Sequence, residues 1–273
     1  MKYAFSGIVA LVFIAFTFSN CKKDDGELKG TGDVVIEMDN HAGDDVLVFG
    51  QKYVTAAGDT VQFSTFNYFV SNFILVKDDG TEFRVAKDSC YFLCKHDDTE
   101  SRELVLRNIP AGDYKSVKFT IGVDSLKSVS PIGERGGVLD PTGGASGMYW
   151  SWNSGYIFVK VEGTSPQAPV DAGTGERTLE YHTGLFGGKD SPTLNNLKQV
   201  TITSSSENAR VRDGHTGEEA PMFHLYVDVL EMFTTPNTFK VSDVPTSHAG
   251  PFSKSVADNY ADMFTLDHVH NHN

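Results

Sequence analysis

The sequence is poor in cysteine, tryptophan and positive charge. Its 273 residues include 3 Cys and 2 Trp, and 23 Lys and Arg stand against 36 Asp and Glu, which gives a formal net charge of −13. A surface this acidic repels phosphate backbones, so nucleic acid is not expected as a partner. Hydrophobic residues make up 40% of the chain, enough for a core, which excludes disorder along its whole length.

A short apolar run at the N-terminus indicates a targeting segment. Lys2 gives a positive start, and residues 7–16 are apolar but too few to cross a bilayer comfortably. The run ends at Phe18-Ser-Asn-Cys21, which resembles a relaxed bacterial lipobox, where a peptidase cuts before the Cys and the thiol is lipidated. We therefore expect residues 1–20 to be a lipoprotein signal peptide and Cys21 to be the lipidation site. The alternative is an ordinary secretory signal with an incidental Cys.

The residues after Cys21 indicate where the protein is located. Lys22-Lys-Asp-Asp25 resembles export signals that move lipoproteins to the outer face of some Gram-negative outer membranes. Residues 21–32 are typical of a flexible tether. We expect a cell-envelope protein that a lipid anchors to the outer membrane, on its periplasmic or its exposed face.

Cys90 and Cys94 are the two remaining cysteines. In an extended strand, residues i and i+4 point to the same face about 13 Å apart, too far for a disulfide. A bulge or turn would close this gap in an oxidising compartment, so a Cys90–Cys94 disulfide stays open as an interpretation. Two lone cysteines are weak support for zinc.

The mature chain is dominated by strand patterns. About a dozen short segments rich in β-branched and aromatic residues are separated by Gly, Asp and Pro, and only residues 254–264 have a helical period. The strands are expected at residues 33–39, 45–49, 60–63, 66–76, 83–86, 90–93, 103–107, 114–123, 156–162, 177–182, 199–203 and 222–230. This pattern predicts a single all-β domain, an antiparallel β-sandwich or Greek-key-like fold with long loops, over residues 33–240, followed by a C-terminal extension over 241–273.

The long segment of residues 124–148 ends in an aromatic cluster. The cluster contains Tyr149, Trp150, Trp152 and Tyr156 and includes both Trp residues of the chain. Loops of this length in compact domains are usually functional or disordered. The cluster fits an anchor in the core, and it also fits a platform on which a carbohydrate stacks.

The same region carries a family resemblance. Gly122-Val-Asp124, Leu139-Asp-Pro141 and the segment Gly147-Met-Tyr-Trp-Ser-Trp-Asn-Ser-Gly-Tyr156 resemble the MbnP-like family, periplasmic copper-binding proteins of methanobactin operons and their relatives. Asn40-His-Ala-Gly43 and Tyr181-His-Thr-Gly184 are also similar. The resemblance implies a β-rich fold. It also implies a copper cofactor, at a Cu(I) site that a kynurenine completes in some members, after a partner di-haem, MauG-like oxidase has oxidised a Trp.

The resemblance also implies which residues bind the metal. Trp150 or Trp152 would be the oxidised residue, His41 and His182 would be ligands, and His224 is a weaker third candidate. Neutral imidazole is a good copper ligand, and Glu180 shares a strand face with His182, where a carboxylate would fix the imidazole tautomer. Copper binding requires His41, His182 and a Trp to converge on one pocket. His41 also fits a turn residue, and His182 also fits a structural histidine.

The other histidines are expected in solvated positions. His96, His215 and His248 lie among Asp, Gly and Ser residues. The tail from His268 to His272 fits a frayed end that picks up divalent metal ions weakly.

The sequence contains none of the common catalytic motifs, so an enzyme is not expected. A copper-binding lipoprotein is the favoured hypothesis. The alternatives are a surface lipoprotein that binds glycan or protein through the aromatic loop, and a structural relative without metal.

Overall fold

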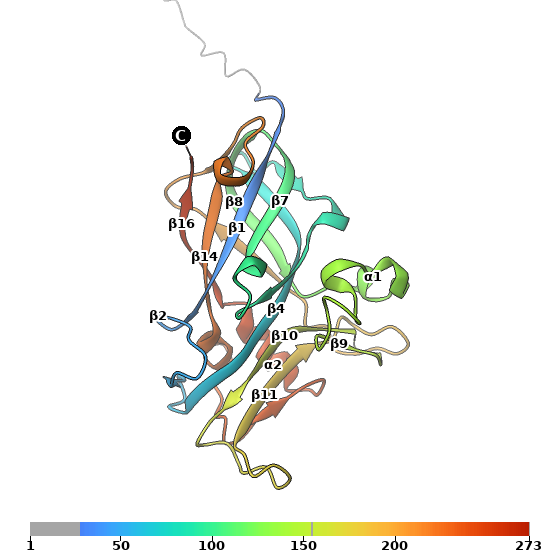
Figure 1. Ribbon diagram of the computed structural model, residues 1–273, viewed down its shortest axis with the longest axis vertical. Coiled ribbons are helices and arrows are strands. Elements are labelled where there is room, and N and C mark those ends of the chain that lie inside the picture. The colour runs from blue at the N-terminus through green and yellow to red at the C-terminus, as the bar shows by residue number, and fades with distance from the viewer. Residues whose placement is uncertain (1–27, 154, 273) are drawn as a thin grey trace, which may run out of the picture.

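The computed structural model describes residues 28–153 and 155–272, which form two β-sheets with a few short helices (Figure 1). The predicted signal peptide of residues 1–20 and the predicted lipidation site Cys21 lie outside the described residues. Within the described residues, no helix has the length and apolar character needed to span a bilayer.

The smaller sheet has five strands in the described part of the chain. Its strands are β16 (Phe264–His270), β14 (Met222–Asp228), β1 (Thr31–Ala42), β2 (Asp45–Val46) and β7 (Glu103–Pro110). The strand β1 pairs with β14, β2 and β7, and β14 pairs with β16. The edge strand β16 therefore comes from the predicted C-terminal extension, and the tail that was expected to fray is hydrogen-bonded into a sheet as far as His270.

The larger sheet has eleven strands among the described residues, and its centre is β4. The strands are β3 (Tyr53–Val54), β4 (Thr60–Lys77), β5 (Glu82–Arg84), β6 (Tyr91–Lys95), β8 (Gly112–Ile121), β9 (Tyr149–Trp150), β10 (Gly155–Thr164), β11 (Thr178–Gly184), β12 (Lys198–Thr203), β13 (Ala209–Val211) and β15 (Thr246–Ser247). The two segments predicted at residues 60–63 and 66–76 are one long strand, β4.

Helical segments are short. They are α1 (Ser125–Ser128), α2 (Ser253–Tyr260) and the 3₁₀ turns η1 (Lys87–Ser89), η2 (Thr99–Arg102), η3 (Ile132–Glu134), η4 (Gly137–Leu139), η5 (Gly217–Glu219) and η6 (Val229–Phe233). The helix α2 overlaps the segment predicted to be helical, residues 254–264, and begins one residue before it. The turns α1, η3 and η4 lie in the long segment before the aromatic cluster, where buried Leu139 accepts a hydrogen bond from the Tyr156 hydroxyl through its carbonyl.

Aromatic side chains fill the space between the two sheets. The ring of Phe264 on β16 contacts Tyr68 on β4 and Phe119 on β8, with centroid distances of 5.8 and 5.1 Å. The buried Tyr68 hydroxyl donates to Asn40 Oδ1 on β1 at 2.8 Å, which satisfies both polar groups inside the core. The all-β prediction is confirmed, and these contacts make the domain a sandwich.

The strand pairing differs from the prediction in one respect. Strand β14 runs parallel to β1, and β15 runs parallel to β11, whereas the other paired strands are antiparallel. Parallel neighbours require a crossover between distant segments, and β1 and β14 are separated by most of the chain. The sheet is therefore mixed. Figure 1 shows β1, β14 and β16 side by side in the upper part of the molecule and β10 and β11 in the lower part.

Candidate metal centre

His182 lies on the outer face of β11, because alternate residues of this strand face the core. Leu179 and Tyr181 are buried in the core, whereas Glu180 and His182 point to the other face. His182 Nε2 lies 2.8 Å from Glu162 Oε1 on the neighbouring strand β10. The carboxylate that fixes the imidazole is thus Glu162, and not Glu180 as the sequence predicted.

His248 completes a group of three potential metal ligands around His182. The two imidazoles stack with a centroid distance of 4.7 Å and an interplanar angle of 13°. His248 Nε2 lies 3.6 Å from Glu180 Oε2. One potential ligand atom from each of Glu180, His182 and His248 lies within 4.8 Å of the other two. We call these three residues the β11 cluster.

The protonation of His182 suits metal binding. Burial lowers the pKa of His182, and the hydrogen bond to Glu162 opposes this shift without cancelling it. Partial burial acts to raise the pKa of Glu162, but hydrogen bonds from Thr65, Lys160 and His182 outweigh it and lower that pKa. At neutral pH an ionised Glu162 therefore accepts the Nε2 proton of a neutral His182, whose Nδ1 keeps its lone pair.

Trp150 packs against Gly184, which strand alternation places on the same face of β11 as His182. Its Cζ3 lies 2.9 Å from the position that a Cβ on Gly184 would occupy, so the indole fills the space left by the missing side chain. Gly184 is two residues from His182 on β11, about 7 Å along the strand. Trp152 stacks on Trp150 with a centroid distance of 5.3 Å and is 52% exposed.

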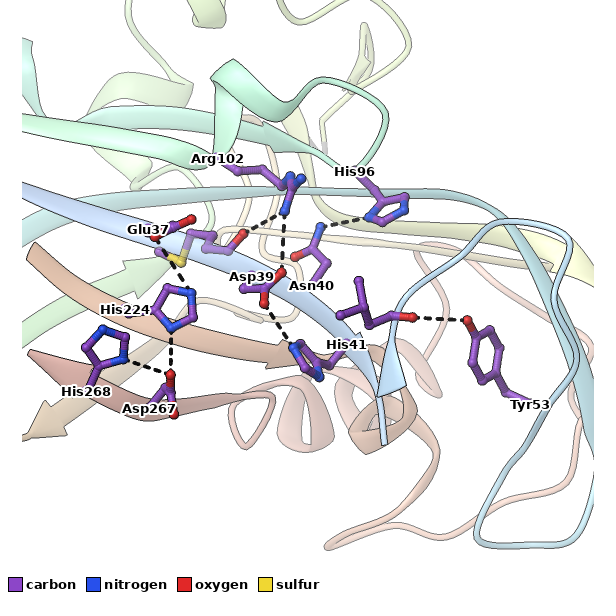
Figure 2. Close-up of polar contacts among 12 residues, drawn as sticks. Glu37, Asp39, Asn40, His41, Tyr53, His96, Arg102, His224, Asp267 and His268 are labelled. Atoms are coloured by element: carbon purple, nitrogen blue, oxygen red, sulfur yellow. Dashed lines mark hydrogen bonds and ion pairs between the residues drawn. The ribbon is translucent and has the colours of Figure 1, made fainter. Parts of the chain in front are cut away.

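His41 lies on the other sheet. It is on β1, where its Nε2 is 3.0 Å from Asp39 Oδ2 (Figure 2). Its ring packs on Tyr226 at a centroid distance of 4.3 Å. It is 9% exposed. The prediction that His41 and His182 converge on one pocket with a Trp is therefore wrong, because the two histidines belong to different sheets with different partners.

His224 also lies on the smaller sheet, in a second group of potential ligands. Its Nδ1 is 2.9 Å from Asp267 Oδ2, and His268 Nδ1 is 2.8 Å from the same oxygen. Glu37 lies on the opposite side of the imidazole, with Oε2 3.7 Å from His224 Nε2 (Figure 2). We call His224, Asp267 and His268 the β16 cluster.

Sequence reasoning missed His248 and Asp267 as potential ligands, and it expected His268 to bind divalent metal ions only weakly, as part of a frayed tail. His248 lies next to β15 and Asp267 and His268 lie on β16, in segments that were expected to be solvated or frayed. In these segments the alternation of polar and apolar residues is too short to predict a strand.

Cys90 and Cys94 are both free and buried, so the interpretation that left a disulfide open is wrong. Cys94 is part of β6, and Cys90 lies between the 3₁₀ turn η1 and the start of this strand. Burial raises the pKa of Cys94 to about 12. These thiols are therefore protonated at neutral pH and are poor metal ligands.

The fold and the clusters define a class of protein, a β-sandwich whose outer strand faces carry histidine–carboxylate groups. The MbnP family model matches residues 31–249, so the chain belongs to the MbnP family. Among solved structures, MbnP from Methylosinus trichosporium is similar in fold, with a TM-score of 0.52 and 18% sequence identity over 81% of this chain and 82% of that chain. No curated protein matches this sequence.

The β11 cluster fits the chemistry of copper. Imidazole nitrogen is a good copper ligand, and copper binds such sites more tightly than other divalent first-row metals do. Two stacked, half-buried imidazoles with a carboxylate within 4.8 Å provide three ligand atoms on a surface that solvent reaches.

Proposed function

We propose that this protein is a lipid-anchored protein of the cell envelope that binds copper at the β11 cluster. The observation that carries the proposal is the stack of His182 on His248 beside Glu180, with Trp150 on the same strand face. His182 and His248 would supply nitrogen ligands, and Glu180 would supply an oxygen ligand to the oxidised metal. The role is binding and not catalysis.

Trp150 is the residue that we propose for oxidation, as a di-haem, MauG-like oxidase partner would perform it. The oxidation uses one dioxygen, or two molecules of hydrogen peroxide that leave two waters; it breaks the indole C2–C3 bond and puts one oxygen atom on each of the two carbons. Hydrolysis of the resulting N-formylkynurenine by one water then releases formate and leaves kynurenine. Trp150 touches Gly184 on β11, whereas Trp152 lies farther out and is half-exposed. Kynurenine at position 150 would add an aromatic amine next to the imidazoles.

Copper titration tests the binding site. A chromophoric chelator would compete for Cu(I) with the wild-type chain and with H182A, H248A and H41A variants. We expect H182A and H248A each to weaken binding by at least about tenfold, because each removes one ligand nitrogen. H41A is the matched control, since His41 lies on the other sheet, and wild-type affinity in H182A would refute the site.

Peptide mass spectrometry of protein from its native host tests the oxidation. We expect the kynurenine mass change on the peptide that contains Trp150 and not at Trp152. Unmodified indole at both positions would refute the oxidised form of the site, while the titration would still decide whether the imidazoles bind copper.

The lipid anchor is tested at Cys21. We expect the wild-type chain to partition with outer-membrane vesicles and to incorporate labelled fatty acid, and a Cys21→Ser variant to do neither. Incorporation of label into the variant would contradict the proposal.

A second function, glycan binding through the aromatic loop, is favoured by one observation. Trp152 is 52% exposed and lines a cavity of about 100 Å³ with the polar side chains of Asn153, Lys189 and Asp190. Sugars stack on exposed indoles while polar neighbours bind their hydroxyls. A Trp152→Ala variant that loses binding on a glycan array, with copper affinity unchanged, would support this second function.

A further inference from the structure

The outer face of the smaller sheet carries a row of titratable side chains across three adjacent strands. Glu37 on β1 is the register partner of His224 on β14, and His224 is the register partner of His268 on β16. Directly opposed residues on neighbouring strands have Cβ atoms about 5 Å apart. The row is therefore set by the backbone pairing of the sheet and does not depend on long, flexible side chains.

A β-bulge brings a fourth side chain to this face. The pairing of β14 with β16 shifts between His224 and Leu225, so that Asp267 is an extra residue in β16. On either side of the bulge, Leu266 and Val269 turn towards the core, while Asp267 and His268 both point outwards. Without the bulge, two consecutive residues would point to opposite faces. Bulges commonly re-aim a side chain in this way at functional sites.

The side chains of His224, Asp267 and His268 converge on one point. A single carboxylate oxygen, Asp267 Oδ2, lies 2.9 Å from His224 Nδ1 and 2.8 Å from His268 Nδ1. One ligand atom of each residue lies within 4.8 Å of the other two. Around a tetrahedral zinc ion with bonds of about 2.0–2.1 Å, neighbouring ligand atoms are about 3.3 Å apart. The three side chains are thus close to the spacing that such an ion requires.

Glu37 faces the other nitrogen of His224. Its Oε2 lies 3.7 Å from Nε2, on the side of the ring opposite Asp267 (Figure 2). A carboxylate that accepts the second N–H of a ligating imidazole fixes its tautomer and strengthens its binding. Glu37 is therefore placed to orient His224 for a ligand at Nδ1.

We propose that the β16 cluster of His224, Asp267 and His268 binds one divalent cation of the zinc class, and that Glu37 is a positioning residue for His224. Two imidazoles and a carboxylate form a donor set that zinc prefers, and a fourth position stays open to water. The His224 side chain is 15% exposed and that of His268 is 54% exposed, so the cation reaches its ligands from solvent. This centre contains no indole and is separate from the β11 cluster.

Bound zinc would fasten the edge strand β16 to β14. Imidazole and carboxylate bind a metal ion in their deprotonated forms, so binding releases protons and weakens at low pH. Because the folded state alone assembles the ligands, zinc raises the melting temperature of the domain.

Zinc titration of an H182A/H248A variant of the full chain isolates this centre from the copper site. We expect one bound Zn²⁺ per chain in this background, and none after the further changes H224A/H268A. A D267N change keeps the shape of the side chain and is expected to weaken binding at least tenfold. H270A/H272A is the control for the terminal histidines and should bind as its parent does. Circular dichroism without metal shows whether each variant is folded.

The role of Glu37 has its own test. E37Q is expected to lower zinc affinity by about 10- to 100-fold, and nitrogen NMR of His224 is expected to show a mixture of tautomers in place of one. The matched control is E103Q, because Glu103 is the neighbour of Glu37 in the register of β1 with β7 and carries the same charge. An H182A/H248A variant that binds no zinc, or zinc binding that survives H224A/H268A, would overturn the proposal. Neither result depends on whether the β11 cluster binds copper.

Discussion

The imidazole rings of His182 and His248 lie almost parallel, with an interplanar angle of 13° and a centroid distance of 4.7 Å. His182 is held from one side by Glu162 and His248 approaches Glu180. Strand β15 places His248 beside His182, because β15 pairs in parallel with β11 and His248 directly follows β15. Two imidazoles that are far apart in the sequence are therefore adjacent in the fold.

Replacing His248 tests whether the stacked ring serves packing or copper binding. His248→Phe keeps an aromatic ring on His182 but removes the nitrogen atoms, so we expect copper affinity to fall at least about tenfold while the melting temperature changes little. His248→Ala should lower the affinity to a similar extent and also remove the stacking contact. Copper affinity of His248→Phe equal to wild type would mean that the stack is structural only.

The pKa of His182 gives a pH prediction. Burial lowers this pKa in the folded state, so the unfolded chain takes up the proton more readily. The contribution of neutral His182 to stability is therefore complete above its unfolded pKa of about 6.5 and is lost as the pH falls through the lower folded value. Imidazole NMR measures the shift directly.

Glu162→Gln is the matching variant for that titration. The hydrogen bond from His182 to the Glu162 carboxylate raises the pKa of His182, so its loss should lower this pKa further. A rise of the His182 pKa in E162Q would contradict the prediction, because it would show that the Glu162 carboxylate does not raise this pKa in the folded chain.

Gly184→Ala tests the contact between Trp150 and β11. A Cβ at this position would lie 2.3 Å from the Tyr156 carbonyl oxygen and 2.9 Å from Trp150 Cζ3, so both the backbone at Tyr156 and the indole must move. We expect a loss of about 1–3 kcal/mol in the free energy of unfolding and a changed fluorescence spectrum, because both Trp residues of the chain lie here. Gly133→Ala, where nothing lies within 4 Å, is the control and should leave both unchanged.

The two buried cysteines give a prediction of low thiol reactivity. Burial raises the pKa of Cys94 to about 12 and also raises that of Cys90, so neither is a thiolate at neutral pH. In a Cys21→Ser background, a thiol reagent such as Ellman's should label no cysteine of the folded chain and two per chain after unfolding. Rapid labelling of the folded protein would contradict the burial of these residues.

Local sequence patterns predicted the strands but not their partners. Alternation of apolar and polar residues located β1, β4, β8, β10 and β14, because one face of each is buried. The parallel pairing of β1 with β14 joins segments from opposite ends of the chain, and no local pattern encodes this pairing. For the same reason, the sequence could not assign His41 and His182 to different sheets.

Local sequence patterns were also insufficient to predict most of the candidate metal ligands. His182 was predicted because the family motif contains it, whereas His248 and His268 lie in short segments that gain structure only by joining a sheet. The bulge at Asp267 interrupts the alternation of apolar and polar residues in β16, because Asp267 and His268 both point outwards. The sequence therefore shows no clear strand pattern at these two candidate ligands.

Anomalous X-ray scattering at the copper edge, from crystals of copper-loaded protein, tests the central claim most directly. We predict a copper peak within bonding distance of His182 and His248, next to residue 150. No peak at this position, or copper bound at His41 or His224 instead, would contradict the assignment of the copper site to the β11 cluster.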